Sequence, residues 1–518
     1  MSQPARRPPR TWRLVTVWVA VLLIASFAIA LGTRARSHSV HAAGPNILLI
    51  LTDDQRWDTL SAMPWVRSDL VAHGVTFTNA FVVNSLCCPS RTSILTGQYS
   101  HSTGVYSNNG PYGGYQAFHG DSSTIATWLH AAGYWTGLVG KYLNGYVGTR
   151  VPPGWDRWVS FSGPPGYYRY RLNVDGLLST AGNAPTDYST SALNQRAVSF
   201  LRSAPRDKPL FLYYAPYAPH LPAVPPPGSR SLATLAPFRP PNYDEVDVSD
   251  KPAWIRRGGP LSRSQEGRID RARRDQLATL VAVDQSVHDV IGELSETGRL
   301  ANTMLVFMSD NGFAWGEHRL FGKESPYEES IRVPMVIRYD SMVRAPRVEP
   351  NLALNIDLAP TFAQLAGVPS PRAEGMSLFP LLRSAGATWR QDFLVEHLAG
   401  LQIPTYCEVR TVRYVYVAYG TGEEELYDLR SDPYELANVA AASGYAHILN
   451  QVRRRLDQLC RPPPPGYEVG HRLPYFATGC LSGTAGRHLV RGMMALVITR
   501  SRWRSMAANI DSTSVSER

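Results

Sequence analysis

Cysteine is scarce in this chain, with five among 518 residues. No Cys-x-x-Cys pair and no zinc-finger spacing occurs, which excludes the common structural zinc modules. The chain also lacks any Asn-x-Ser or Asn-x-Thr sequon, so nothing indicates a glycosylated eukaryotic secretory protein. Internal repeats and low-complexity arrays are absent. The composition, 44% hydrophobic and 18% charged, is that of an ordinary globular protein. The few cysteines therefore need individual explanations.

One long uncharged apolar run occurs near the N-terminus. Four arginines lie within residues 6–13, and the apolar run 14–32 follows them. This order is typical of a signal peptide, and the run is also long enough to serve as a membrane anchor. Small-residue cleavage sites end at Ala30 and Ala43. We therefore expect residues 1–43 to be a signal peptide or signal anchor. The protein is then exported, either secreted, periplasmic or cell-surface, and touches the membrane only through this segment if it is uncleaved.

The formal net charge of +10 does not indicate a nucleic-acid partner. Four of the positive charges are the leader arginines, and most others are scattered along the chain. Only residues 453–455 and the C-terminal tail concentrate basic residues. A solvated surface explains such a distribution, so we expect no nucleic-acid partner.

Four near-continuous apolar runs, at residues 46–54, 134–141, 210–216 and 304–312, have the pattern of strands buried on both faces. Helical segments are expected between them, at residues 124–132, capped by residues 121–123, at 190–203 and at 270–297. The alternation predicts an α/β catalytic domain over residues 44–385, with a mostly parallel central sheet and helices on both faces. A proline-rich insertion at 221–262 is expected to be a functional or disordered loop.

The pattern of apolar residues along the sequence changes after residue 385. Short β-like runs at 411–420 and 425–429, followed by a helical segment near 443–459, predict a small antiparallel sheet with a terminal helix over residues 386–465. Residues 466–518 are expected to form a peripheral basic tail. Its segment 488–503 could pack on the body or lie on a membrane.

Acidic and amide side chains follow two of the predicted strands. Asp53 and Asp54 follow the first run, and Asp310 and Asn311 follow the last. Ligands in open α/β sheets bind beyond the carboxyl ends of the strands. Oxygen-only ligands suit Ca²⁺, or alternatively Mg²⁺. Helix capping and turn formation are the competing explanation for each pair taken alone, but together the four residues predict a cation site.

Cationic side chains are predicted at the same edge of the sheet. Lys141 follows the second run, His220 follows the third, and Lys323 follows the fourth after a short loop. Each taken singly is more often a solvated residue. Together they could bind an anionic ester, with His220 donating a proton to the leaving oxygen.

The stretch 86-LCCPSRTSILTG-97 contains two adjacent cysteines at the expected start of a helix. Pro89 suits a first helical turn and Gly97 could end the helix. Cys87 would then lie at the helix N-terminus, where an anion is favoured, with Arg91 in the same turn. The competing interpretation is a buried structural cysteine. A disulfide between Cys87 and Cys88 would be strained. Cys460 and Cys480 could form a disulfide, which would leave Cys407 unpaired, although the sequence does not settle this pairing.

These motifs resemble the formylglycine-dependent sulfatases of the alkaline-phosphatase superfamily. The run from Cys87 through Pro89, Ser90 and Arg91 to 95-LTG-97 is similar to the first family signature, and 133-GYWTGLVGKY-142 to the second. The resemblance covers roughly residues 45–440 and ends in 426-LYDLRSDPYELAN-438. It implies an alkaline-phosphatase-like fold and hydrolysis of a sulfate monoester. It also implies that a formylglycine-generating enzyme oxidises Cys87, not Cys88, to formylglycine (3-oxoalanine).

The resemblance assigns roles residue by residue. Ca²⁺ would be held by Asp53, Asp54, Asp310, Asn311 and the modified Cys87. The substrate sulfate would be held by Arg91, Lys141 and Lys323, while His220 protonates the leaving alcohol. Many family members have a histidine where this chain has Leu143, which leaves the base for the elimination step open. His101 is a candidate, and a packing role is its alternative.

The form 140-GKYLNGY-146 is similar to the branch of N-acetylglucosamine-6-sulfatases and extracellular heparan sulfatases, as is the segment 241–256. This branch implies a sulfated amino sugar as substrate, and small aryl sulfates are also expected to fit. Two alternatives remain at this point. One is a phosphodiesterase or phosphonate monoester hydrolase of the same superfamily. The other is an inactive exported binding protein with an unconverted cysteine.

Overall fold

The computed structural model describes residues 44–227, 235–343, 346–400 and 402–467. The predicted leader, the tail segment 488–503 and Cys480 lie outside these residues. All described residues belong to one compact unit. Among the described residues, no helix is both long enough and apolar enough to cross a bilayer.

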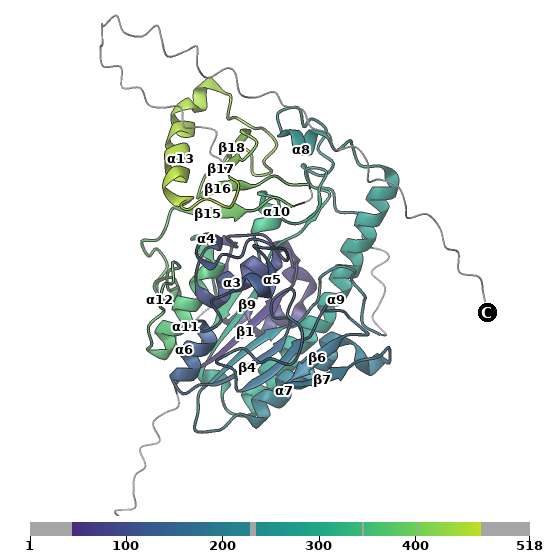
Figure 1. Ribbon diagram of the computed structural model, residues 1–518, viewed down its shortest axis with the longest axis vertical. Helices are drawn as coiled ribbons and strands as arrows, with labels where there is room; N and C mark the ends of the chain where they lie inside the picture. Colours follow the sequence, from purple (N-terminus) through teal and green to yellow (C-terminus); the bar gives the residue numbers. More distant parts are fainter. Residues whose placement is uncertain (1–43, 228–234, 344–345, 401, 468–518) are drawn as a thin grey trace, which may run out of the picture. The chain divides into compact units, whose positions relative to one another are not determined.

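The central feature is a ten-stranded sheet (Figure 1). Its five middle strands, β9, β1, β8, β4 and β5, are parallel, and antiparallel strands extend it on both sides. The mostly parallel sheet predicted from the sequence is confirmed. In spatial order its strands are β13 (Arg347–Glu349), β2 (Val75–Phe77), β12 (Met335–Arg338), β9 (Thr303–Ser309), β1 (Asn46–Thr52), β8 (Leu210–Ala215), β4 (Trp135–Gly140), β5 (Arg157–Phe161), β6 (Arg171–Val174) and β7 (Leu177–Thr180).

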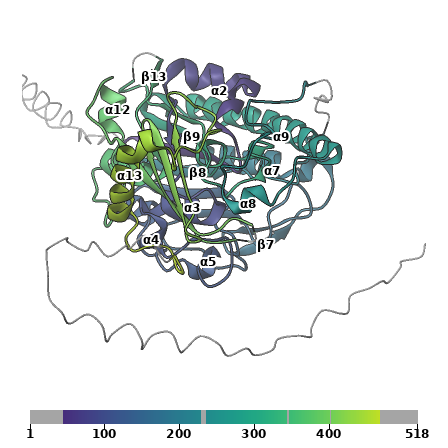
Figure 2. The ribbon, with the colours of Figure 1, turned by 90° about the horizontal axis from the view of Figure 1, so that it is seen from above.

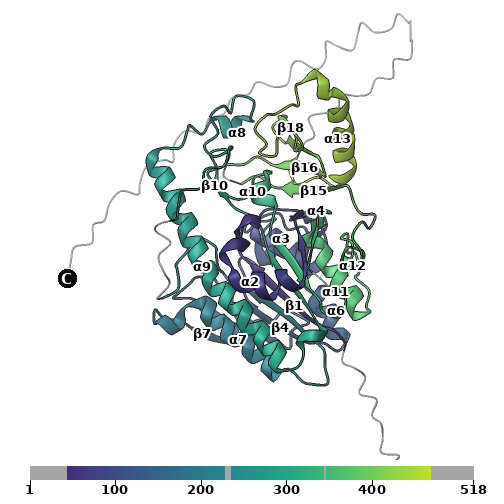
Figure 3. The same cartoon turned by 180° about the vertical axis from the view of Figure 1, so that it is seen from behind.

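Strand β1 is apolar at nearly every position, because both of its faces are buried. Ile47, Leu49 and Leu51 belong to one hydrophobic core, on the side of α3, α6 and α11. Leu48 and Ile50 belong to a second core, on the side of α2, α7 and α9. Figures 1 and 3 show these two helix layers from opposite sides of the sheet. Helices therefore cover both faces, and every side chain of the strand is removed from water.

The α-helices of the described residues are α2 (Pro64–Asp69), α3 (Cys87–Thr96), α4 (Ser100–Thr103), α5 (Gly114–Ala117), α6 (Ile125–Ala131), α7 (Ser189–Ser203), α8 (Ala253–Arg256), α9 (Arg263–Glu296), α10 (Glu328–Ile331), α11 (Leu358–Ala366), α12 (Phe379–Arg383) and α13 (Ala446–Leu459). The short 3₁₀ helices are η1 (Trp57–Ala62), η2 (Val71–His73), η3 (Pro185–Asp187), η4 (Leu300–Asn302), η5 (Asn355–Asp357) and η6 (Ser443–Tyr445). Two small sheets pair β3 (Ala80–Phe81) with β14 (Ala353–Leu354) and β10 (Ala314–Trp315) with β11 (Phe321–Gly322).

Two helix starts differ from the expectation. Helix α6 is capped by Thr124, not by residues 121–123, because Thr124 and Thr127 form a reciprocal capping box. Helix α9 begins at Arg263, seven residues before the expected start, because Ser262 and Gln265 form a second capping box. The polar first turns of α9 lack the apolar period that located the rest of the helix.

A separate four-stranded antiparallel sheet forms the C-terminal part of this unit, as predicted (Figure 2). Its strands are β15 (Asp392–His397), β16 (Tyr406–Thr411), β17 (Tyr414–Tyr419) and β18 (Glu424–Asp428). Helix α13 packs on one face, and Phe81, Tyr327 and Leu354 pack on the other. The domain boundary predicted at residue 385 falls between α12 and β15 and stays a prediction.

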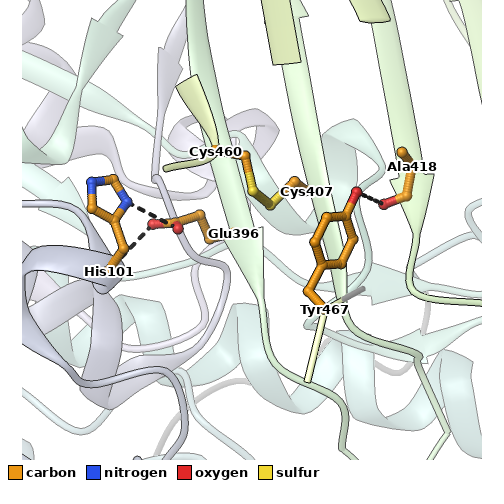
Figure 4. The surroundings of a disulfide bond; sticks show 6 residues. All are labelled: His101, Glu396, Cys407, Ala418, Cys460 and Tyr467. Atoms are coloured by element: carbon orange, nitrogen blue, oxygen red, sulfur yellow. Dashed lines mark hydrogen bonds and ion pairs between the residues drawn. A yellow bond between two sulfur atoms is a disulfide. The ribbon is translucent and has the colours of Figure 1, made fainter. Parts of the chain in front are cut away.

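The disulfide of the C-terminal part joins Cys407 to Cys460 (Figure 4). The suggested pairing of Cys460 with Cys480 is therefore wrong. Cys407 lies in β16 on the face that α13 covers, and Cys460 is the C-cap residue of α13. Packing of the helix on the sheet brings the two together, and sequence spacing does not reveal that contact.

Candidate active site

Strands β1 and β9 bring the four predicted metal ligands together. The strands are parallel neighbours with Thr52 opposite Ser309, so the residues that follow them meet at one edge of the sheet. The Asp54 amide donates a hydrogen bond to Asp310 Oδ1 at 3.1 Å. The Asn311 Nδ2 amide donates to Asp54 Oδ1 at 2.8 Å. Asp53, Asp54, Asp310 and Asn311 are all buried.

Helix α3 places Cys87 against these carboxylates. Cys87 is the first residue of the helix, and its Sγ lies 3.4 Å from Asp53 Oδ1. Asn108 Oδ1 accepts a hydrogen bond from the Cys88 amide at 2.8 Å, which satisfies one free donor of the helix start. Gly97 ends the helix in the left-handed region, with φ 73°. The helix predicted from Pro89 and Gly97 is thus confirmed.

Three cations surround the cysteine and the carboxylates. Lys323 Nζ lies 2.7 Å from Cys87 Sγ and 2.5 Å from Asp54 Oδ1. Lys141 Nζ, delivered by the end of β4, lies 2.5 Å from Asp53 Oδ2. Arg91 is completely buried, with its Nε 2.7 Å from Asp310 Oδ2 and one terminal nitrogen donating to the Lys141 carbonyl at 2.8 Å. The other terminal nitrogen of Arg91 forms an ion pair with Asp53 Oδ2 at 3.6 Å and makes no hydrogen bond among the described residues.

His220 reaches the cluster from the segment after β8. Its Nε2 lies 3.6 Å from Asp54 Oδ2, and its Nδ1 lies 2.5 Å from the Leu221 carbonyl. Because a carbonyl only accepts hydrogen bonds, this contact places a proton on Nδ1 and leaves Nε2 as the nitrogen that exchanges its proton. Tyr217 OH also contacts Nδ1, at 2.8 Å. Sequence reasoning missed Tyr217, although it lies only three residues before His220.

Burial and ion pairing act in opposite directions on these groups. Burial raises the pKa of Asp53, but Lys141, His220 and Arg91 outweigh it and bring that pKa down to about 2. Burial raises the pKa of the Cys87 thiol to about 12, with Asp53 adding to the effect and Lys141 and Lys323 opposing it. An unmodified Cys87 is therefore a thiol at neutral pH and a weak nucleophile.

Part of the site has the spacing of a metal-binding group, although it includes the sulfur of Cys87 and a nitrogen of His220 and not Asp310. Asp53, Asp54, Cys87 and His220 each place one ligating atom within 4.8 Å of all the others. Asn311 Oδ1 is buried and has no hydrogen-bond partner among the described residues, so it is an acceptor that a cation would satisfy. Carboxylate and amide oxygens are the ligands of Ca²⁺ and Mg²⁺. We call the assembled residues the cysteine cluster: Asp53, Asp54, Cys87, Arg91, Lys141, His220, Asp310, Asn311 and Lys323.

His101 is the one predicted site residue that the structure does not bring to this cluster. Its Nδ1 lies 3.0 Å from Glu396 Oε1 in β15 (Figure 4). Its Nε2 lies 3.5 Å from Glu374 Oε1. Burial lowers the pKa of His101, but these two carboxylates outweigh it and raise the pKa to about 10. At neutral pH the imidazole is a cation held between helix α4 and strand β15.

A second buried group of ligating side chains lies elsewhere in the structure, and we call it the glutamate cluster: Asn242, His318, Glu329 and Glu435. His318, Glu329 and Glu435 place ligating atoms within 4.8 Å of one another. The Asn242 Nδ2 amide donates to Glu329 Oε1 at 3.0 Å. Glu329 Oε2 and Glu435 Oε1 are buried without hydrogen-bond partners among the described residues. Sequence reasoning missed this cluster, although Glu435 lies in the C-terminal motif 426–438.

The fold and the cysteine cluster define an alkaline-phosphatase-like α/β hydrolase. The sequence matches the Sulfatase family over residues 45–368 and the C-terminal region of N-sulphoglucosamine sulphohydrolase over residues 316–461. The chain therefore belongs to the sulfatase family and is a sulfuric ester hydrolase.

Similar proteins are known in animals and bacteria. Human N-acetylglucosamine-6-sulfatase is 32% identical over 88% of this chain and 91% of its own length. The N-acetylglucosamine-6-O-sulfatase of Bacteroides thetaiotaomicron is 27% identical over 85% of this chain and 90% of its own length. An extracellular sulfatase SULF-1 homolog of Drosophila melanogaster is 36% identical over 70% of this chain, but the match spans only 34% of that protein.

Solved structures agree with this assignment. One, described as a complex with its substrate D-glucosamine-2-N,6-O-disulfate, superimposes with a TM-score of 0.71 and 26% identity. It covers 81% of this chain and 98% of its own. A phosphonate monoester hydrolase of Agrobacterium radiobacter has a TM-score of 0.64 at 21% identity, over 80% of this chain and 95% of its own, and so shares the fold.

Proposed function

We propose that this sulfatase removes the 6-sulfate of an N-acetylglucosamine-type amino sugar, with Cys87 converted to formylglycine. The observation that carries the proposal is the position of Cys87 at the start of α3, where Asp53 and Lys323 contact its Sγ. The names of two relatives, N-acetylglucosamine-6-sulfatase and N-acetylglucosamine-6-O-sulfatase, support the choice of substrate.

The modification explains how a buried cysteine becomes reactive. Because the thiol has a pKa of about 12, it is a poor nucleophile in its encoded form. Formylglycine at position 87 would supply the nucleophilic oxygen from its hydrated aldehyde. Conversion needs a formylglycine-generating enzyme as a maturation partner.

The cation that we propose is Ca²⁺, with Mg²⁺ as the alternative, held by Asp53, Asp54, Asp310, Asn311 and modified residue 87. When bound, it would stabilise negative charge that develops at the reacting centre. The fit rests on the all-oxygen ligand set and on the unsatisfied Asn311 Oδ1.

Lys141 and Lys323 are proposed to hold the substrate sulfate. Both Nζ atoms lie within hydrogen-bond distance of the carboxylates beside Cys87, so they present positive charge where the ester must bind. Arg91 positions Asp310 and the Lys141 backbone and offers its remaining terminal nitrogen to the sulfate. A fully buried guanidinium keeps its charge and its orientation.

His220 is proposed to protonate the leaving alcohol. Its Nδ1 proton is directed to the Leu221 carbonyl, so Nε2 faces the cluster. Only the imidazolium, protonated on both nitrogens, can donate the Nε2 proton to the leaving oxygen. Burial lowers the pKa of His220, whereas Asp54 and Asp53 oppose this and favour the imidazolium. We assign His101 a structural role in place of the base considered from the sequence, because Glu396 and Glu374 hold it as a cation.

We further propose that the chain acts outside the cytoplasm. The N-terminal pattern at residues 1–43 supports export as a secreted, periplasmic or cell-surface protein. The Drosophila melanogaster relative, named an extracellular sulfatase SULF-1 homolog, supports the same location.

Substrate comparison tests the proposal. The purified enzyme is offered N-acetylglucosamine 6-sulfate, its 3-sulfate and 4-sulfate isomers, a chromogenic aryl sulfate and a matching phosphate diester. Release of sulfate should be fastest from the 6-sulfate and measurable from the aryl sulfate. Faster turnover of the diester, or of another positional isomer, would refute the proposed substrate.

A further inference from the structure

A cavity of about 510 Å³ has Lys141, a member of the cysteine cluster, among its lining residues. This volume lies within the usual range of about 300–1,000 Å³ for small-molecule sites. The proposed sulfate-binding residue Lys141 is thus also a lining residue of the cavity, so a substrate bound there has space beside it.

The walls of the cavity combine apolar surfaces with amide groups. Phe161, Pro164 and Pro165 supply apolar surface. Asn108 uses its Oδ1 to accept from the Cys88 amide, which leaves its Nδ2 group without a partner among the described residues. Asn144 Oδ1 is buried and also unpartnered among them. Apolar patches with free amide groups suit the faces and hydroxyls of a sugar.

Arg171, the exposed first residue of β6, is the second charged residue of this lining besides Lys141. It has no ion-pair or hydrogen-bond partner for its guanidinium among the described residues. Its neighbours differ, because Arg150 pairs with Asp121 at 2.8 Å and Arg157 pairs with Asp175 at 2.9 Å. Arg169 donates to Asn183 at 2.8 Å. An unpaired guanidinium at a cavity is available for a carboxylate or a sulfate of a ligand.

We propose that this cavity is a subsite for a saccharide that carries a second anionic group, and that Arg171 recognises that group. The inference rests on the proposed function, since it extends the same substrate beyond its reacting sulfate. The second anion is a carboxylate or a sulfate, and both offer two oxygens to a guanidinium. Arg171 is then a specificity residue of the sulfatase, and saccharides with two negative groups are its preferred substrates.

The test compares Arg171→Gln with wild type on three substrates: N-acetylglucosamine 6-sulfate, glucosamine 2-N,6-O-disulfate, and a 6-sulfated disaccharide with an adjoining uronic acid. The first has one anionic group, the second adds a sulfate, and the third adds a carboxylate. We expect KM to rise about tenfold for the substrate whose second anion reaches Arg171, as for one lost ion pair. The kcat values and the KM of the singly charged sugar should stay unchanged.

Two further variants are the controls. Arg196→Gln removes an exposed arginine of α7 that does not line the cavity, and it should behave as wild type on all three substrates. Arg171→Lys keeps the charge and should recover part of the lost affinity. Equal KM changes on all three substrates, or none on any, would overturn the inference.

A competition assay separates this inference from the proposed function. The assay measures how strongly the doubly charged saccharides inhibit turnover of a chromogenic aryl sulfate. Inhibition requires only that the saccharide binds, not that it is cleaved. If wild type fails to cleave the 6-sulfated sugars, the proposed substrate is wrong. If inhibition by those saccharides is equally strong in Arg171→Gln and wild type, the subsite is wrong.

Discussion

The cysteine cluster and the glutamate cluster are both buried and both rich in carboxylates, yet their charges are balanced differently. In the cysteine cluster, three carboxylates, Asp53, Asp54 and Asp310, face three permanent cations, Arg91, Lys141 and Lys323. In the glutamate cluster, Glu329 Oε2 and Glu435 Oε1 have no partner among the described residues.

This difference has a direct chemical consequence. Since the cysteine cluster is already near neutral, a bound divalent cation makes it positive, and a positive buried site attracts an anionic ester. In the glutamate cluster, protonation of a carboxylate removes the negative charge instead. Burial, together with Glu317, raises the pKa of Glu329 to about 7 although Arg56 opposes the rise, so this cluster binds a proton near neutral pH.

The largest expected effect separates the two adjacent cysteines. Cys87→Ala removes the group that we propose to react, and turnover should fall by at least about 10³-fold. Cys88 lies in the hydrophobic core beneath the helix, so Cys88→Ala should keep turnover within about threefold if the protein folds. Circular dichroism and steady-state kinetics on both variants are the measurements. The reverse pattern would show that the reactive residue is misassigned.

Chelation should affect only the cysteine cluster. Dialysis against EDTA should remove a tightly held ion and reduce turnover by about 10²-fold or more, with recovery on adding Ca²⁺. Asp310→Asn should lower the ion content of the purified protein, measured by elemental analysis. Glu435→Gln should leave it unchanged, because we assign a proton to that cluster. A lower ion content in Glu435→Gln would contradict the assignment of the ion to the cysteine cluster and of a proton to the glutamate cluster.

A smaller effect is expected on stability, from Glu329→Gln. Because the folded-state pKa of Glu329, about 7, is above the usual 4.5, the folded protein binds the extra proton between these values. Wild type therefore loses stability as pH rises from about 4.5 to about 7, whereas the glutamine variant avoids that loss. Relative to wild type, the variant should gain on the order of 1–3 kcal/mol between pH 5 and pH 8.

Denaturant unfolding of both proteins at pH 5 and pH 8 measures this gain, with turnover unchanged within about twofold. A stability difference between the variant and wild type that is the same at both pH values would disprove a proton held by Glu329.

The sequence predicted four central strands of the sheet and the residues that follow them, but not β2, β5, β6, β7, β12 or β13. Continuous apolar runs located β1, β4, β8 and β9, and the rule that ligands lie beyond parallel strand ends predicted which side chains meet. The choice of Cys87 over Cys88 as the modified residue rests on the family signature and stays a prediction, because local chemistry alone did not separate the two.

What the sequence did not reveal depends on packing between distant segments. The Cys407–Cys460 disulfide follows from how α13 lies on β16. His101 lies only a few residues after α3, but its partners Glu374 and Glu396 come from the far C-terminal side of the sequence. The glutamate cluster likewise joins three separate stretches that no local pattern connects.

Mass spectrometry of the peptide that contains residue 87, from protein made in its native host, tests the central claim most directly. We expect an aldehyde in place of the thiol at residue 87, with Cys88 still a cysteine. An unmodified thiol at residue 87 in active enzyme would contradict it.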